Sequence, residues 1–418
     1  MSKGETIVGL DIGTTKICAI IGEMDEDRME IIGVGTAPSH GLKKGVVVNI
    51  DSTIKSVENA ISEAELMAGV EVSSVYAGIA GSHIKGINSH GVIAISRGRE
   101  VTSADMERVI DAAKAVSIPL DREIIHVLPQ QFIIDGQDGI KEPIGMSGTR
   151  LEVEIHIVTG AVTSAQNIVK CVNRSGLEVD DLVLEPLAAS YAVLTEDEKD
   201  LGVVLVDIGG GTTDIGIFID GSIWHTSVLS IGGDNVTKDI SVGLRTPVVD
   251  AEKIKINYGC ATPSLVKDDE MIEIPSVGER RSKTLPRQVL SEIIEPRMEE
   301  IFSLINQEIR MTGYENIIAS GIVLTGGAAM LKGSAELAEK IFDLPVRIGV
   351  PKGVAGLVDV INSPVYATGV GLVLYGMKNR LDGKKTRSKE GSVTPYAAIV
   401  STSRSMRSFS SVSAIFRS

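Results

Sequence analysis

Two segments with the same hydrophobic pattern, each near the start of one half of the chain, organise the rest of the sequence. They are IVGLDIGTTK at 7–16 and VLVDIGGGTTD at 204–214. In each, a short apolar run reaches an aspartate, Asp11 or Asp207, and a turn of glycine and threonine follows. Such a run predicts a buried strand, and the glycines let a ligand approach the backbone. The repetition predicts two similar lobes that face a common ligand.

Strand and helix patterns alternate in the rest of each half. Apolar residues at 54, 57, 61 and 64 recur at helical spacing, so we expect a helix capped by Asp51 or Ser52. A long helix should begin at Pro286. Its expected core positions are Val289, Ile293, Ile301, Ile305 and Ile309. Further strands are expected at 17–22, 29–35, 75–81 and 317–327, and an apolar helix at 363–376.

The pattern changes between residues 82 and 160. Glycine-punctuated apolar runs predict strands, and Thr102 with Asp105 predicts the start of a helix that continues to about Val116. TRLEVEIHIVTG at 149–160 alternates strictly, which predicts a half-buried strand. We therefore expect a small β-rich insertion with one helix.

Composition places the chain among ordinary globular proteins of more than one domain. The chain has 418 residues, of which 43% are hydrophobic and 23% charged. Its net charge of −14 argues against a general nucleic-acid binder. Cys18, Cys171 and Cys260 are far apart, which favours buried thiols over a zinc site or disulfides. We expect no signal peptide, because Glu5 follows Lys3 and the apolar run breaks at Asp11. We also expect no membrane span, because no apolar run approaches ~18–20 residues.

The two glycine turns have the composition of a phosphate-binding site. Backbone N–H groups and hydroxyls bind phosphate oxygens, and carboxylates hold the waters of a bound Mg²⁺. We assign Asp11 and Asp207 to the hydrated metal. Two plain β-turns with charged tips are the alternative, but both turns follow apolar strands and both contain T-T. The expected phosphate-binding residues are Gly13, Thr14, Thr15, Lys16, Gly209, Gly210, Gly211, Thr212 and Thr213.

Two other groups are candidates for the nucleoside part of the ligand. Gly326, Gly327 and Ala328 follow an apolar strand, and a glycine pair lets a flat ring such as adenine approach the backbone. An ordinary GG turn is the alternative. Glu252 and Lys255 lie three residues apart on one helix face and could bracket a ribose. A solvated surface pair is the alternative there.

Glu185 is the candidate for a catalytic group. It directly precedes Pro186, which marks a helix start between the two expected lobes. A carboxylate at that place could orient a water for phosphate hydrolysis, and a hinge cap without chemistry is the alternative. The chain contains no GxxxxGK[ST] segment, so a P-loop site is excluded.

The order of these motifs resembles the actin, sugar-kinase and heat-shock chaperone ATPase superfamily. The matching segments are LDIGTTK, LEPLAAS, VDIGGGTTD, LTGGAAM and YATGVGL. Within that superfamily the chain resembles the FtsA family of bacterial cell-division actin homologues over residues 5–377. The more specific segments are VYAGIAGSHIKGINSHGVIAI, SIGGDNVTKDI, VDAEKIKINYGCA and LSEIIEPRMEEIF. The resemblance implies an α/β, actin-like, two-lobed ATPase fold with the FtsA-type inserted subdomain.

The resemblance also implies a division of the chain into five parts. The first lobe comprises 1–83, 161–198 and 364–377, and residues 84–160 form the inserted α+β subdomain. The second lobe comprises 199–240 and 306–363. Residues 241–305 form its smaller subdomain, and residues 378–418 form a basic linker and tail.

For function, the resemblance implies a nucleotide-dependent cytoskeletal adaptor. Such a protein binds ATP and Mg²⁺, polymerises with itself, and is at most a slow ATPase. It binds the C-terminal peptide of the tubulin-like protein FtsZ near residues 241–305, with Arg297 as a contact, and also binds later division proteins. It works at the cytoplasmic face of the bacterial cell membrane, at the division site, and binds no nucleic acid.

The tail departs from the family pattern of a basic helix rich in aromatic residues and leucine. Residues 378–418 contain nine Lys or Arg and two acidic residues, and residues 379–392 are expected to be a flexible linker. On a helical wheel Met406, Phe409 and Phe416 lie on one side, which suggests a weak interfacial helix on anionic lipids. A disordered serine-rich tail is the alternative.

Three other functions fit the superfamily less well. A sugar or acid kinase needs an acceptor pocket, for which the sequence has no motif. A chaperone ATPase needs a substrate domain that the tail is too short to form. A pilus-assembly actin homologue with the same insertion is closer, but GGDNVTKDI and EPRM favour the division protein.

Overall fold

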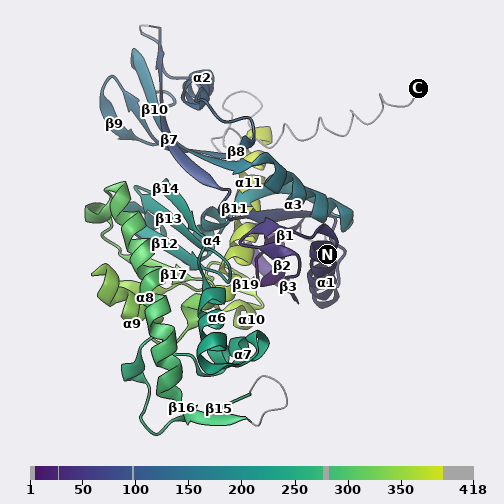
Figure 1. Ribbon diagram of the computed structural model, residues 1–418. Helices are drawn as coiled ribbons and strands as arrows, with labels where there is room; N and C mark the ends of the chain where they lie inside the picture. The colour runs from purple at the N-terminus through teal and green to yellow at the C-terminus, as the bar shows by residue number, and fades with distance from the viewer. Residues whose placement is uncertain (1–4, 27, 97, 276–281, 389–418) are drawn as a thin grey trace.

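The structure, a computed structural model, describes residues 5–26, 28–96, 98–275 and 282–388. Three β-sheets organise it, which we call the first sheet, the insert sheet and the second sheet. Figure 1 shows the insert sheet above the second sheet, with the first sheet beside them. None of the helices in the described part of the chain is long and apolar enough to cross a membrane.

The first and second sheets repeat one strand order. The first runs β11-β6-β1-β2-β3-β19 and the second runs β18-β17-β12-β13-β14. In both, three parallel strands come first and two antiparallel strands follow. The first sheet has β19 as a sixth strand, parallel to β3. The strands of the first sheet are β1 (Glu5–Ile12), β2 (Lys16–Asp25), β3 (Arg28–Pro38), β6 (Ser74–Ile79), β11 (Glu178–Leu184) and β19 (Ala355–Gly356). Those of the second are β12 (Val203–Ile208), β13 (Thr213–Ile219), β14 (Ser222–Leu229), β17 (Ile322–Thr325) and β18 (Val346–Ile348).

Helices cover both sheets and enclose two large apolar cores. Around the first sheet lie α1 (Ile50–Ala68), α3 (Val162–Arg174), α4 (Glu185–Val193) and α11 (Ala367–Ser388). Around the second lie α6 (Gly233–Leu244), α7 (Val248–Tyr258), α8 (Arg287–Thr312) and α9 (Ser334–Phe342). The core of the first sheet continues onto one face of the second through Leu205, Phe218 and Val323. The two halves therefore share a packed boundary.

The predicted insertion is present as a sheet with its own core. Its strand order is β7-β10-β8-β9, and α2 (Ser103–Lys114) packs on β7 and β10. Thr102 and Asp105 form the expected capping box at the start of α2. The strands are β7 (Lys85–Ala94), β8 (Arg122–Ile134), β9 (Gln137–Ile140) and β10 (Arg150–Ala161).

Strand β10 corrects the prediction of a half-buried strand. It lies between β7 and β8, and its side chains are buried on both faces. Its polar residues are paired instead of exposed: the Glu152 carboxylate accepts from Arg150 at 2.7 Å, and Gln131 donates to Glu154 at 2.8 Å. An alternating sequence pattern cannot distinguish buried polar side chains that have hydrogen-bond partners from polar side chains that face solvent.

Two helix predictions also needed correction. Helix α1 begins one residue before the expected cap, because Asn49 Oδ1 accepts from the Ser52 N–H at 3.0 Å. In α8, Val289 is 37% exposed and Ile293 is only partly buried. The core is reached instead by Leu290, Ile294, Met298, Ile301, Phe302, Ile305 and Ile309. The first two predicted positions lie about 100° around the helix from this stripe.

The remaining differences concern element ends. Strand β17 covers only Ile322–Thr325, because Gly321 adopts a left-handed turn at φ 71°. The predicted helix at 363–376 begins at Ala367, after a 3₁₀ turn (Pro364–Tyr366), and extends to Ser388. The expected flexible linker is therefore wrong over 379–388, where Arg380 anchors the helix to Glu5. Residues 389–392 lie outside the described part.

The other elements are short. They are β4 (Leu42–Lys43), β5 (Val46–Val47), the hairpin β15 (Met271–Ile274) and β16 (Lys283–Pro286), α5 (Glu196–Leu201) and α10 (Val358–Ile361). Three further 3₁₀ helices in the described residues are η1 (Pro263–Leu265), η2 (Glu315–Ile317) and η3 (Gly327–Met330). All three cysteines are free and buried, as expected.

Candidate nucleotide-binding cleft

The two glycine turns have the same backbone geometry. In the β1–β2 turn the Gly13 N–H donates to the Lys16 carbonyl at 3.1 Å, and in the β12–β13 turn the Gly209 N–H donates to the Thr212 carbonyl at 3.0 Å. Asp11 and Asp207 occupy the same place in their strands, two residues before the first glycine of each turn. The sequence repeat is therefore a structural repeat.

The turns lie against each other across the boundary between the two sheets. A Cβ on Gly211 would come within 2.8 Å of the Thr14 hydroxyl oxygen. The Thr15 hydroxyl reaches Asp234 Oδ1, at the start of α6, at 3.4 Å. Glycine is needed at this contact because any side chain would push the two halves of the site apart.

Four carboxylates, from Asp11, Glu185, Asp207 and Asp214, gather beneath the turns. Burial raises the pKa of Asp11 to about 7 and that of Asp207 to about 6. Burial and the neighbouring Asp207 raise the pKa of Asp214 to about 8. The pKa of Glu185 is also raised well above its usual range, first by burial and then by the other three carboxylates. The cluster is thus electrostatically unfavourable when fully ionised.

Lys16 is the cation that acts on this cluster, and it lowers the pKa of Asp11 and Asp207. Its ammonium donates to the Val365 carbonyl at 3.1 Å and lies 4.4 Å from the centre of the Tyr366 ring. Thr368 on α11 donates to Asp207 Oδ2 at 3.0 Å. One lysine does not balance four carboxylates.

These residues fit a hydrated divalent cation. Asp214 Oδ1 is buried without a hydrogen-bond partner, an arrangement that calls for an ion or water. Among the described residues, no three His, Cys, Asp or Glu side chains lie close enough to hold a metal directly. Mg²⁺ keeps several of its waters in proteins, so Asp11 and Asp207 would hold it through water, as the sequence predicts.

The residues predicted to contact the nucleoside also lie close together. Lys255 Nζ on α7 donates to the Gly233 carbonyl at 3.2 Å and pairs with Glu252 at 2.7 Å. A Cβ on Gly233 would meet Ala328 Cβ at 3.3 Å. The start of α6, helix α7 and the turn at 326–328 therefore meet at one place. Gly326 has φ 87°, which brings that turn against the Ile208 carbonyl.

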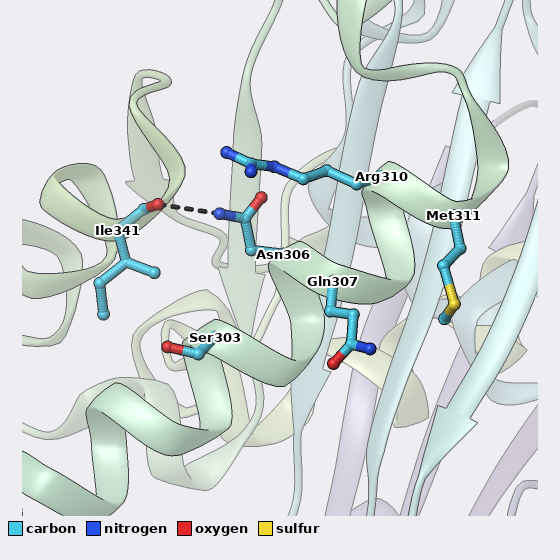
Figure 2. Close-up of a pocket in the computed structure, with 6 residues that line it drawn as sticks. All are labelled: Ser303, Asn306, Gln307, Arg310, Met311 and Ile341. Atoms are coloured by element: carbon cyan, nitrogen blue, oxygen red, sulfur yellow. Dashed lines mark hydrogen bonds between the residues drawn. The ribbon is translucent and has the colours of Figure 1, made fainter.

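Other predicted site residues lie apart from this cleft. Arg297 on α8 pairs with Asp239 on α6 at 2.5 Å and with Glu300. Met406, Phe409 and Phe416 lie outside the described residues. A surface pocket of about 540 Å³ lies on the outer side of α8 and contains none of the turn residues (Figure 2). Its lining residues are Ser303, Asn306, Gln307, Arg310, Met311 and Ile341.

Sequence reasoning missed three residues of the cleft. Asp214 lies opposite Asp207 in the β12–β13 hairpin, a register that the VLVDIGGGTTD pattern already implied. Thr368 belongs to YATGVGL, whose threonine was not assigned a role. Asp234 had no signal of its own, because its place beside Thr15 depends on the packing of two distant segments.

Comparisons with known proteins identify the family to which this chain belongs. The family described as "Cell division protein FtsA" matches residues 204–371, and "SHS2 domain inserted in FTSA" matches residues 81–159. The cell division protein FtsA of Pseudomonas aeruginosa is 56% identical over 384 residues, covering 92% of each chain. The chain belongs to the FtsA family of cell division proteins.

Solved structures agree with the FtsA assignment at the level of fold. The PilM-PilN type IV pilus biogenesis complex matches with a TM-score of 0.67 and 16% identity, covering 89% of this chain and 98% of that one. MreB5 of Spiroplasma citri bound to ADP matches with a TM-score of 0.53 and 15% identity, covering 93% and 99%. The prediction of an actin-like fold with the FtsA-type insert is therefore confirmed.

Proposed function

We propose that this FtsA-family protein binds ATP with Mg²⁺ between its two glycine turns. The supporting observation is the meeting of the turns above four carboxylates and a single lysine. Gly209–Thr213 would bind phosphate oxygens from one side, and Gly13–Lys16 from the other. Gly326, Gly327 and Ala328 would face the adenine, and Glu252 with Lys255 would contact the ribose.

The nucleotide is proposed to set the conformation of a polymerising adaptor, with slow hydrolysis at most. Glu185 would orient the attacking water, because it opens α4 beside Asp11 and Asp214. Its raised pKa means that it must lose a proton before it can accept one from water. Mg²⁺ supplies positive charge that favours the ionised form, which ties any hydrolysis to the metal.

We propose that the protein is an adaptor that links FtsZ filaments to the cytoplasmic face of the membrane at the division site. We propose the domain boundaries given by the sequence, except that residues 378–388 belong to the first lobe as the end of α11. Residues 241–305 are proposed as the site for the C-terminal peptide of FtsZ. Apolar side chains are exposed there on α6, α7 and β15, and the bound peptide would cover them. They are Val242, Val248, Val249, Ile256 and Met271. Self-assembly and binding of later division proteins are parts of the same proposal.

The FtsZ part is tested by fluorescence anisotropy with a labelled FtsZ C-terminal peptide and the full chain. Arg297→Glu should weaken binding by at least about ten-fold, because it replaces a cation by an anion beside Asp239. Arg310→Glu, on the far half of the same helix, is the matched control and should bind like the native chain. No binding by the native chain would contradict the adaptor role and leave the fold untouched.

The membrane part is tested with anionic liposomes. Met406, Phe409 and Phe416 would insert, and the basic residues of 389–418 would add electrostatic attraction. Truncation after Ser388 should therefore abolish sedimentation with the liposomes. Equal sedimentation of the full and truncated chains would contradict the anchor.

A further inference from the structure

The insert sheet is hydrogen-bonded to the edge strand of the second sheet. Strands β7, β8 and β10 all contact β14, which lies below the insert sheet in Figure 1. Gln130 on β8 donates to the carbonyls of Ile223 and Trp224, both at 3.3 Å. Lys141 donates to the Ser222 hydroxyl at 3.1 Å. These bonds join segments about 90 residues apart and cover the free edge of β14.

A buried histidine completes this contact. His156 on β10 is 1% exposed, with Nδ1 2.6 Å from Asn88 Oδ1 and Nε2 2.8 Å from the Thr226 hydroxyl. The Asn88 amide donates in turn to the Trp224 carbonyl at 3.2 Å. Asn88 Oδ1 is therefore the acceptor, and His156 donates from Nδ1. Burial lowers the pKa of His156 to about 3, so the ring is neutral and accepts the Thr226 proton at Nε2.

The same strand β8 reaches the nucleotide cleft on its other side. His126 Nε2 accepts the Leu184 N–H at 2.9 Å, and both groups are buried. Leu184 is the last residue of β11 and precedes Glu185. The side chain of Arg122, also on β8, donates to the carbonyls of His83 at 2.9 Å and Thr159 at 2.8 Å, where the insert joins the first sheet.

We propose that strand β8 clamps the two halves of the molecule and positions the cleft between them. His126 is a positioning residue for the backbone at Glu185, while Gln130, four residues on, binds β14 of the second sheet. Separation of the two glycine turns then requires the insert to release β14, leaving buried carbonyls without donors. A ligand on the insert would in this way change nucleotide exchange. The effect on nucleotide exchange rests on the proposed function, whereas the clamp formed by β8 does not depend on it.

The clamp is tested with Gln130→Met in the full chain. Met has a similar shape and no donor, so hydrogen exchange of the amides in 222–229 should become about ten-fold faster. Gln131→Met is the matched control, because the Gln131 side chain bonds within the insert, to Glu154 and Gly139. Lys141→Met is a second, less buried test and should show a smaller acceleration in the same amides. Native-like exchange in both test variants, with a native melting curve, would overturn the clamp.

The link to the cleft is tested by release of a fluorescent ADP analogue. Gln130→Met should release it several-fold faster than Gln131→Met. His126→Leu should do the same and His126→Gln should restore the native rate, because glutamine keeps an acceptor for the Leu184 N–H. If hydrogen exchange of the amides in 222–229 is fast but the ADP analogue is released at the native rate, the link to the cleft is overturned and the clamp stands. Failure of every variant and the native chain to bind the analogue would contradict the proposed nucleotide function, and the exchange data would still decide the clamp.

Discussion

The two glycine turns share a backbone but differ in chemistry. The first turn supplies two threonine hydroxyls and the Lys16 ammonium. The second turn has three glycines and no lysine, and the hydroxyl of its Thr213 is buried and donates to the Ile231 carbonyl at 2.8 Å. Across the hairpin, Asp11 lies opposite Cys18, whose pKa burial raises to about 12, and Asp207 lies opposite Asp214. The first turn therefore contributes positive charge and hydroxyls, and the second contributes bare N–H groups and negative charge. Under the proposed function, the first turn would bind the phosphate with its cation and hydroxyls, and the carboxylates of the second turn would hold the metal.

The largest effect is expected from the second turn's metal carboxylate. Asp207→Ala should raise the dissociation constant for Mg²⁺-ATP at least about 100-fold, since charge-assisted bonds to the hydrated metal are lost. Asp197→Ala, on the exposed first turn of α5, is the control. Isothermal titration calorimetry measures both. Unchanged ATP affinity of Asp207→Ala would refute the proposed cleft.

The contact between the turns gives the next largest effect. Gly211→Ala places a methyl group 2.8 Å from Thr14, and overpacking of about 1–3 kcal/mol should weaken ATP binding by about ten-fold or more. Gly209→Ala has its nearest neighbour at 3.3 Å, so its loss of affinity should be smaller than that of Gly211→Ala. Neither glycine has a positive φ, so neither alanine substitution strains the backbone. A difference in affinity between the two variants therefore reports the contact with Thr14.

A second substitution sharpens this comparison. Thr14→Gly in the Gly211→Ala background removes the side chain that the new methyl group meets. Affinity should then recover toward that of Thr14→Gly alone. The same loss in the single and double variants would show that the turns do not meet in solution.

The acidic cluster predicts a pH dependence of stability. The raised pKa of Asp11 and Asp214 means that both stabilise the fold when protonated, and that this stability is lost as pH rises through about 7 and 8. Without Mg²⁺, the free energy of unfolding should fall between pH 6.5 and 8 by on the order of 1–2 kcal/mol. The buried histidines His126 and His156 have lowered pKa values, so they are neutral across this range.

Urea denaturation at several pH values measures this dependence. Asp214→Asn should flatten the profile, because the amide removes the carboxyl that has the higher pKa of these two aspartates. In the proposed cleft Mg²⁺ would be held by the ionised carboxylates, so the stabilisation that it adds should grow from pH 6.5 to 8. A stability that rises over this range without metal would contradict the buried, protonated cluster.

The sequence predicted local features of this site better than contacts between distant segments. Strands β1 and β12, their aspartates and the glycine turns follow from apolar runs and turn residues a few positions apart. The pairing of Thr15 with Asp234, or of His126 with the Leu184 N–H, joins residues 219 and 58 positions apart and leaves no periodic signal. Strand β10 was predicted half-buried for the same reason, since only the fold reveals that its polar side chains are paired.

The smallest expected effect on Mg²⁺-ATP binding comes from the hydrogen bond between Thr368 on α11 and Asp207 before the second turn. Thr368→Val removes the 3.0 Å hydrogen bond to Asp207 and keeps the side-chain shape. That bond lowers the pKa of Asp207, so its loss should raise this pKa further and weaken Mg²⁺-ATP binding by a few-fold at pH 6.5. The deficit should shrink at pH 8, where Asp207 is ionised in both proteins. Thr15→Val is the counterpart in the first turn, where the 3.4 Å contact is exposed, and any deficit there should not depend on pH. A Thr368→Val deficit that is equal at both pH values would show that the hydroxyl acts by packing instead of through the Asp207 carboxylate.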